Sequence, residues 1–313
     1  MDINLKGTIL RIERTSIHDG TGLRTVVFMK GCPLRCIWCS TPESHNIKIE
    51  KGYLSNKCSG CGICINSCPE EALSFSLNNR IVIDKDRCKM NLLCYERCPN
   101  NAYKKYGKIM TVSELINEIS KDEIFYFHSE GGVTFSGGEP LLQSEFLSKV
   151  MEQCKRLGIH VAMETCLFAP FKNISKILPY LDDLYVDIKH MDSNKHKKYT
   201  GVDNSMILEN ILKIDDTDYP IDIYIRIPLI PTINDSKENL LSTINFCRNI
   251  KKLKEIEILP YHRLGIETYK NLGLEYKLSD IKVPTTTVIQ EIGDFMTANS
   301  QGIRIRIGGS LVE

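Results

Sequence analysis

The stretch Gly31-Cys-Pro-Leu-Arg-Cys-Ile-Trp-Cys39 places three cysteines in one short loop, with the spacing C-x3-C-x2-C. Three thiolates this close can each bind one iron of a [4Fe–4S] cubane, and no fourth cysteine completes the run. Because clusters that only transfer electrons are usually held by four cysteines, the incomplete set indicates a fourth iron that is free to bind a substrate. A structural zinc site is the alternative, but three cysteines with no histidine beside them fit it poorly.

The sequence around this loop alternates strand-like and helix-like segments. Helical spacing is clearest in the apolar residues between Leu142 and Leu157. Strands are expected at 24–29, 132–136, 160–164, 184–188, 221–229 and 255–259. Six strands that alternate with helices imply parallel β/α units. We therefore expect an α/β fold, a partial (β/α)6 barrel, with a last edge strand at 303–307.

Seven of the thirteen cysteines lie in a stretch that breaks this alternation. The run Cys58-x2-Cys61-x2-Cys64-x3-Cys68-Pro69 has the spacing of bacterial ferredoxins, in which the fourth cysteine of one run binds the other cluster. This rule assigns one cubane to Cys58, Cys61, Cys64 and Cys98. We expect a ferredoxin-like domain at 52–106, called the insert below, within a barrel made of 1–51 and 107–313.

The second site of the insert is one thiolate short. Its cysteines are Cys68, Cys88 and Cys94, and Asn91 stands where the remaining cysteine is expected. A cubane here needs another ligand, such as the Asn91 carbonyl oxygen or water, and oxygen suits iron–sulfur clusters less well than sulfur. We expect a bound but labile [4Fe–4S] cluster. The alternative is that the second run holds no iron and only folds around the first cubane.

Composition narrows the functional classes. With 40 Lys and Arg against 39 Asp and Glu, nothing suggests a nucleic-acid partner. No run approaches the ~20 apolar residues that span a bilayer, and the N-terminus lacks a signal-peptide core, so we expect no membrane association and a cytoplasmic location. In a reducing compartment the cysteines indicate metal binding or catalysis rather than disulfides. The scattered Cys154, Cys166 and Cys247 are interpreted as core packing.

The cysteine loop, with an aromatic residue before its last cysteine, resembles the motif of the radical S-adenosylmethionine (SAM) superfamily. There the open iron chelates the amino and carboxylate groups of SAM. The resemblance implies Trp38 near the adenine and a cluster held by Cys32, Cys36 and Cys39. Upstream, Asp19-Gly-Thr-Gly-Leu-Arg24 resembles the D-G-P-G-I-R signature of glycyl radical enzyme activases, with Thr21 in place of the usual proline.

Three further motifs of this family end predicted strands, where a β/α barrel places its ligands. Ser136-Gly-Gly-Glu-Pro140 resembles G-G-E-P, Asp187-Ile-Lys189 resembles D-x-K, and Leu259-Pro-Tyr-His262 resembles the activase L-P-Y-H. The resemblance implies SAM contacts from Gly137, Gly138, Glu139, Asp187, Lys189 and His262. The glycines would let backbone approach the ligand, Glu139 would accept from the SAM ammonium, and Lys189 would pair with the SAM carboxylate.

Two other positions are left open. Glu164-Thr165 stands where the pyruvate formate-lyase activase has Asp-Thr near a monovalent cation, and the longer Glu is not assigned a cation. Arg226 lies in an apolar strand, where it would be costly if unpaired, and faces either SAM or an internal carboxylate.

Together these resemblances imply a glycyl radical enzyme activase, anaerobic and monomeric. One-electron reduction of the loop cluster would cleave SAM to methionine and a 5′-deoxyadenosyl radical, which takes a hydrogen from a glycine of the partner enzyme. A flavodoxin or a ferredoxin-type protein would supply the electron. The insert resembles that of the larger activases, which serve dehydratases, decarboxylases, choline lyase and arylalkylsuccinate synthases.

Two other functions compete with this one. A radical SAM enzyme that acts on a small molecule or peptide would share most of these motifs, except the D-G-x-G-x-R and L-P-Y-H strings. A non-catalytic electron carrier would leave the open iron unexplained, together with the strand-end residues Glu139, Lys189 and His262.

Overall fold

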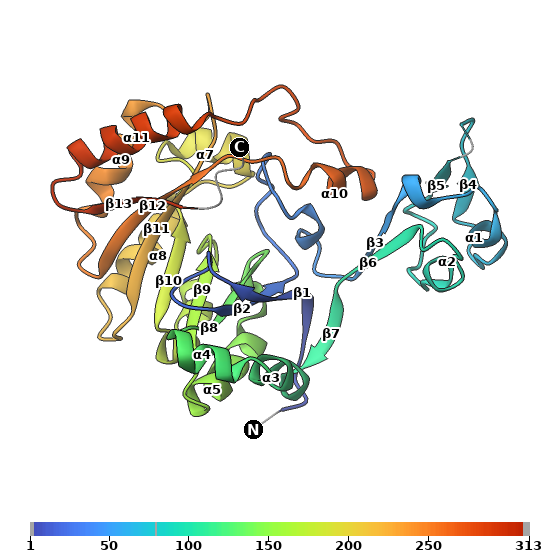
Figure 1. The fold of residues 1–313 in the computed structure, drawn as a ribbon, viewed down its shortest axis with the longest axis horizontal. Helices are drawn as coiled ribbons and strands as arrows, with labels where there is room; N and C mark the ends of the chain where they lie inside the picture. Colours follow the sequence, from blue (N-terminus) through green and yellow to red (C-terminus); the bar gives the residue numbers. More distant parts are fainter. Residues whose placement is uncertain (1–2, 79, 309–313) are drawn as a thin grey trace.

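The apolar runs predicted as strands assemble into one curved nine-stranded sheet (Figure 1). The structure is a computed structural model and describes residues 3–78 and 80–308. Seven strands are parallel, in spatial order β2 (Arg24–Met29), β8 (Gly132–Gly137), β9 (His160–Thr165), β10 (Asp183–Asp187), β11 (Asp222–Leu229), β12 (Leu253–Pro260) and β13 (Arg304–Ile307). The predicted α/β fold is confirmed, including β13 at the edge.

Two strands at the other edge were not predicted. β1 (Lys6–Ser16) pairs antiparallel with both β2 and β7 (Lys108–Thr111). β1 mixes apolar and charged residues, and most of its second half is exposed. Its sequence therefore lacks the continuous apolar run by which a parallel strand buried on both faces is recognised.

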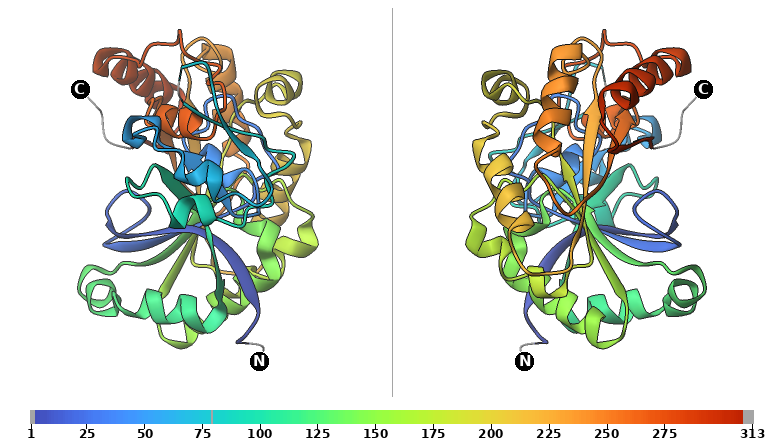
Figure 2. Two further views of the ribbon diagram at one scale, coloured as in Figure 1. Left: turned by 90° about the vertical axis from the view of Figure 1, so that its right-hand side faces the viewer. Right: turned by 90° about the vertical axis from the view of Figure 1, so that its left-hand side faces the viewer.

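Helices cover the outer face of the sheet (Figures 1 and 2). In α5 the apolar stripe Phe146, Leu147, Val150, Met151 and Cys154 is buried, as its spacing predicts. The expected ends Leu142 and Leu157 are exposed outside the helix. The helices on the barrel are α3 (Val112–Ser120), α4 (Glu123–Ser129), α5 (Ser144–Arg156), α6 (Phe171–Ile174), α7 (Ser193–Thr200), α8 (Ser205–Asp215), α9 (Lys237–Cys247), α10 (Ile266–Asn271) and α11 (Thr286–Asn299). Among the described residues, no helix is both long and apolar enough to cross a membrane.

The insert projects from one side of the barrel (Figure 1), and faces the viewer in the left panel of Figure 2. Its own apolar core is small, and two of its buried members, Cys64 and Cys94, are predicted cluster ligands. A core of this size stabilises a fold weakly, so bound iron is expected to contribute much of the stability. Its elements are β3 (Glu50–Tyr53), α1 (Ile63–Asn66), β4 (Leu73–Phe75), β5 (Ile81–Ile83), α2 (Leu93–Glu96) and β6 (Tyr103–Tyr106).

The antiparallel pair β3 and β6 forms the neck between the insert and the barrel. Lys30, fully buried just after β2, fixes the start of this neck. Its ammonium donates to the Glu43 carbonyl at 2.5 Å and to Glu50 Oε2 at 3.1 Å. Burial lowers the pKa of Lys30, and Glu50 opposes that effect. Because a buried charge is costly unless it is paired, these contacts hold the neck in one position.

Candidate active site

A cavity of about 290 Å³ opens at the carboxyl ends of the parallel strands. This is the end of a β/α barrel at which ligands bind. Its walls come from the cysteine loop and from the ends of β8 to β12. Except for Glu139, all the residues predicted to hold the loop cluster and SAM line the cavity. They are Cys32, Cys36, Trp38, Cys39, Gly137, Gly138, Asp187, Lys189 and His262.

The cysteine loop is held by backbone hydrogen bonds from both sides. The amides of Arg35 and Ile37 donate to the carbonyls of Thr200 and Tyr199 at 2.7 and 3.1 Å. Burial raises the pKa of the Cys36 thiol to about 12. Without a metal these thiols therefore stay protonated, and a metal that binds them must displace the protons. Three thiols on one cavity wall fit a cluster that needs three protein ligands.

The two glycines of the G-G-E-P motif are required by backbone packing. A Cβ on Gly138 would lie 2.1 Å from the Gly31 carbonyl oxygen, and one on Gly137, whose φ is 112°, would lie 2.4 Å from Met29 N. The amide of Glu139 also donates to the Gly31 carbonyl at 2.7 Å. These glycines thus bring the end of β8 against the start of the cysteine loop. The close approach at these glycines is to the loop and to β2, and the expected approach of their backbone to the ligand stays a prediction.

We expect Gly138→Ala to release the loop cluster. The added methyl group cannot coexist with the Gly31 carbonyl, and overpacking of this kind costs about 1–3 kcal/mol or more. Iron analysis and thermal denaturation would measure the loss. Gly158→Ala is the matched control, because a Cβ there meets no atom within 4 Å and adds only the strain of a positive φ. Equal iron content in both variants would contradict this role of Gly138.

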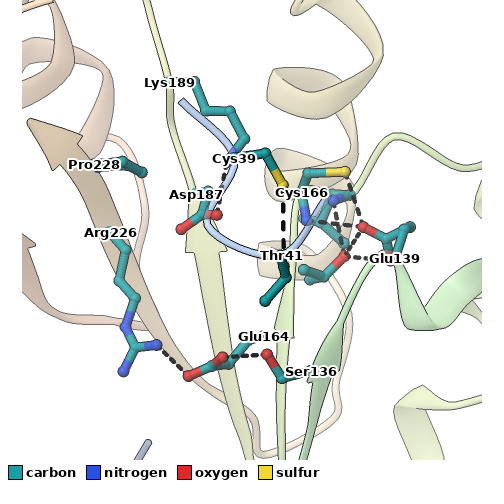
Figure 3. A network of polar contacts seen from close by, with 12 residues as sticks. Cys39, Thr41, Ser136, Glu139, Glu164, Cys166, Asp187, Lys189, Arg226 and Pro228 are labelled. Atoms are coloured by element: carbon teal, nitrogen blue, oxygen red, sulfur yellow. Dashed lines mark hydrogen bonds and ion pairs between the residues drawn. The ribbon is translucent and has the colours of Figure 1, made fainter. Parts of the chain in front are cut away.

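Glu139 differs from the expectation. It is fully buried and does not line the cavity, because its carboxylate is engaged by its own surroundings (Figure 3). It accepts hydrogen bonds from Leu141 N, from Thr165 Oγ1, and from the amide and thiol of Cys166, at 2.7 to 3.0 Å. Burial raises the pKa of Glu139, and these donors oppose the rise. A sequence motif gives the position of a carboxylate but does not say which nearby donors it faces.

Cys166 is a residue whose place the sequence interpretation missed. We expected core packing, as is found for Cys154 in α5 and Cys247 in α9. Cys166 is also buried, but it lines the cavity and donates its thiol to Glu139 at 2.9 Å. Its position directly after the strand-end pair Glu164-Thr165 was the available signal.

Asp187 and Lys189 lie together on the cavity wall (Figure 3). Lys189 Nζ donates to Asp187 Oδ2 at 2.8 Å, and its side chain is 10% exposed. Burial lowers the pKa of Lys189, but Asp187 together with the thiols of Cys36 and Cys166 raises it overall, so the ammonium stays charged. Asn234, itself fully buried, holds the Lys189 carbonyl at 2.9 Å and the Pro228 carbonyl at 2.7 Å. The site therefore offers one fixed cation to an anionic group of a ligand.

The sequence left open whether Arg226 faces SAM or an internal carboxylate. In the structure Arg226 lines the cavity and also pairs with internal carboxylates. Its Nε donates to Glu257 Oε2 at 2.6 Å, and its Nη1 donates to Glu164 (Figure 3). The guanidinium lies over the Tyr185 ring, 4.3 Å from its centroid. Burial raises the pKa of Glu164 to about 7, and Arg226 opposes that rise. Ser136 Oγ also donates to Glu164.

Trp38, within the cysteine loop, and His262, after β12, also line the cavity. Trp38 is 8% exposed and packs with Ile230 and Tyr261. Burial lowers the pKa of His262, so its ring is neutral near pH 7. Its Nδ1 accepts a long hydrogen bond from Leu264 N, at 3.4 Å.

The Asp19–Arg24 loop is fixed to the sheet by its last residue. Arg24 is fully buried and donates to Thr134 Oγ1 at 2.6 Å, to the Val133 carbonyl at 2.7 Å and to the Thr21 carbonyl at 3.1 Å. Thr134 in turn donates to the Asp19 carbonyl at 2.7 Å. Just before the loop, the His18 carbonyl accepts from Arg226 Nη2 at 3.2 Å. The motif therefore connects to the polar network beneath the cavity.

The insert brings its first set of predicted ligands around one small pocket, lined by Cys58, Cys61, Cys64 and Cys98. Tyr103 also lines this pocket, and its buried hydroxyl faces the Cys64 thiol. The same hydroxyl could donate to the sulfur of a cluster held there. At the second set, Lys51 Nζ lies 3.1 Å from Cys94 Sγ.

Comparison with known proteins gives matches over nearly the whole chain. The radical SAM superfamily matches residues 82–244, and a 4Fe-4S dicluster domain matches residues 57–102. The (2S)-3-sulfopropanediol dehydratase activating enzyme of Klebsiella oxytoca is 43% identical, covering 96% of this chain and 97% of its own. The 4-hydroxyphenylacetate decarboxylase activating enzyme of Clostridioides difficile is 41% identical, covering 97% and 96%. A radical SAM methyltransferase structure from Sphaerobacter thermophilus has a TM-score of 0.55 at 11% identity, covering 97% and 78%, which shows a shared fold.

Proposed function

The chain belongs to the radical SAM activating enzymes of glycyl radical enzymes. On that premise we propose which of its residues hold the clusters, bind SAM and meet the partner enzyme. The resemblance drawn from the motifs is confirmed, as are the cofactors, SAM and [4Fe–4S] clusters in the barrel and in the insert. When bound, the reduced cluster and SAM supply methionine and a 5′-deoxyadenosyl radical that takes a hydrogen from a glycine of the partner enzyme.

We propose that residues 1–51 and 107–313 form the catalytic barrel, in which Cys32, Cys36 and Cys39 hold the cluster. The three thiols on one cavity wall support this assignment most directly. The insert, residues 52–106, receives electrons, because its first site lies at the surface, where Cys61 is exposed. Its first cluster is held by Cys58, Cys61, Cys64 and Cys98. A flavodoxin or a ferredoxin-type protein is the donor, and the enzyme acts as a cytoplasmic monomer.

For SAM we propose binding by the residues that share the cavity with the thiols. Lys189 neutralises the SAM carboxylate, and Asp187 keeps that ammonium in place at 2.8 Å. Trp38 and His262 also bind SAM, and Gly137 and Gly138 shape the approach. Glu139 acts in this arrangement as a positioning residue that holds Thr165 and Cys166, and it meets the SAM ammonium only if those hydrogen bonds open.

The partner is proposed to be a glycyl radical dehydratase or decarboxylase. These are the two classes named for the relatives above, and both relatives match this chain through the insert as well as the barrel. The loop Asp19–Arg24, which Arg24 fixes to the sheet, and the string Leu259–His262 favour an activase over a radical SAM enzyme with a small-molecule substrate.

The test is to mix the reduced enzyme anaerobically with SAM and the glycyl radical enzyme encoded beside it. We expect a glycyl radical doublet in the electron paramagnetic resonance (EPR) spectrum, and no doublet when the acceptor glycine of the partner is replaced by alanine. Stoichiometric 5′-deoxyadenosine should accompany the radical. Catalytic SAM consumption on a free small molecule, with no protein radical, would instead favour the rival function.

A further inference from the structure

The insert consists of two halves that repeat the same backbone. Cys58, Cys61, Cys64 and Cys68 of the first half correspond in order to Cys88, Asn91, Cys94 and Cys98 of the second. The helices α1 and α2 follow equivalent loops. The two halves also match at every position of positive φ: Gly60 and Met90 (73° and 57°), Gly62 and Leu92 (75° and 63°), and Glu71 and Asn101 (47° and 50°).

The second half adopts this backbone at a cost in conformational free energy. Met90 and Leu92 have side chains where the first half has glycine, and the left-handed conformation costs such residues roughly 1–2 kcal/mol each. Strain of this kind persists only where the surrounding structure or a ligand imposes it. Lys89 and Asn91 of the second loop are exposed, and Met90 and Leu92 are only half-buried, so the loop is not held by a closed core. The loop therefore retains the shape that wraps a cluster.

Three of the four ligand positions are also retained. Cys94 is buried in the core of the insert, and Cys68 packs against that core. Cys68 Sγ accepts from Ala72 N at 3.4 Å, as Cys98 Sγ of the first site accepts from Ala102 N at 3.2 Å. Amide donors of this kind stabilise a thiolate, and Lys51 adds a cation beside Cys94 at 3.1 Å.

The fourth position is different because the side chain of Asn91 is already engaged. Its Oδ1 accepts from Leu93 N at 3.0 Å, and its Nδ2 donates to Glu70 Oε2 at 2.6 Å. An amide oxygen is a hard ligand that competes poorly for cluster iron even when it is free. Asn91 is exposed, like Cys61 at the equivalent corner of the first site. This position of the site thus lacks a thiolate and faces solvent, and the Glu70 carboxylate beside it is engaged by Asn91.

From this we infer that the second site of the insert holds a three-iron [3Fe–4S] cluster bound by Cys68, Cys88 and Cys94, with the iron absent at the corner beside Asn91. This differs from the [4Fe–4S] cluster that a dicluster domain implies and that we expected from the sequence. The inference rests on the insert alone. It holds or fails independently of the SAM site and of the partner enzyme.

The test uses the full chain with Cys36→Ala, which removes the loop cluster as a second source of three-iron species. Anaerobically reconstituted protein should contain about seven irons per chain, four in the first insert site and three in the second. After mild oxidation it should give the EPR signal of an oxidised three-iron cluster at about one spin per chain, while an oxidised cubane is silent.

Reciprocal variants at positions 91 and 61 would show which of the two insert sites gives the three-iron EPR signal. Adding Asn91→Cys should abolish the three-iron signal and raise the iron content by about one per chain. Adding Cys61→Asn instead should double the signal and lower the iron content by about one. About eight irons with no signal, as a cubane completed by Glu70 or water would give, overturns the inference. About four irons, as an empty second site would give, overturns it equally.

Discussion

Cys36→Ala is expected to reduce SAM cleavage to the uncatalysed background. Cys36 is half-buried at the centre of the cysteine loop and lines the same cavity as Cys32 and Cys39. With only three protein ligands available, the loss of one leaves two irons without a thiolate, and the cluster should dissociate. Methionine and 5′-deoxyadenosine released by the anaerobic, reduced protein would be measured by chromatography.

The matched control for this variant is Cys154→Ala. Cys154 is more deeply buried than Cys36, but it lies in α5, away from the cavity. Its replacement should cost stability and leave cleavage in place. Cys36→Ala should also lose about four irons while the insert retains its own. Cleavage at the wild-type rate in Cys36→Ala would refute the assignment of the loop cluster.

Arg226→Met is expected to destabilise the protein by about 3–5 kcal/mol, because it leaves the buried Glu164 without its cation and Glu257 with Arg306 alone. Glu257 is 2% exposed and Glu164 is 17% exposed at the side chain, and both pair with Arg226. The free energy of unfolding in urea would measure the loss. Arg306→Met is the control: Arg306 also pairs with Glu257, at 2.9 Å, but it is 47% exposed, and such pairs contribute about 0–1 kcal/mol.

The loss in Arg226→Met should depend on pH. Burial already raises the pKa of Glu164, and without Arg226 nothing of comparable strength opposes that rise. In the wild type the pKa of Glu164 is about 7, and without Arg226 it should lie higher, so the folded variant binds this proton at a pH where the wild type does not. The loss should therefore shrink as the pH falls toward about 7 from above, and it should stay constant at lower pH, where Glu164 is protonated in both folded proteins. A loss that is independent of pH, or no larger than that of Arg306→Met, would contradict the buried network.

The sequence predicted the barrel and most of the cavity wall because both follow from local patterns. Strands buried on both faces appear as continuous apolar runs, and motifs at their carboxyl ends must meet at one edge of the sheet. Lys189 and His262 are brought to one cavity for this reason. Glu139 could not be placed in the same way, since its orientation depends on donors from β9 and from the turn after β8.

Asn91 shows a different limit. The spacing identified it as the position that lacks a cysteine, but the state of its amide depended on Glu70, which lies in the other half of the insert. The left-handed conformations of Met90 and Leu92 were likewise invisible in the sequence. The composition of the second cluster is therefore argued from three-dimensional contacts, and from the sequence only the missing thiolate could be inferred.

The neck gives the insert an unusual independence. Glu50 pairs with Tyr106, and Tyr53 pairs with Tyr103. The two chain segments that join the insert to the barrel therefore lie side by side in the neck. A tight turn could join β3 directly to β6 in place of the insert. Closing so short a connection would cost little conformational entropy. The insert could therefore be exchanged for such a turn without altering the residues that line the cavity of the barrel.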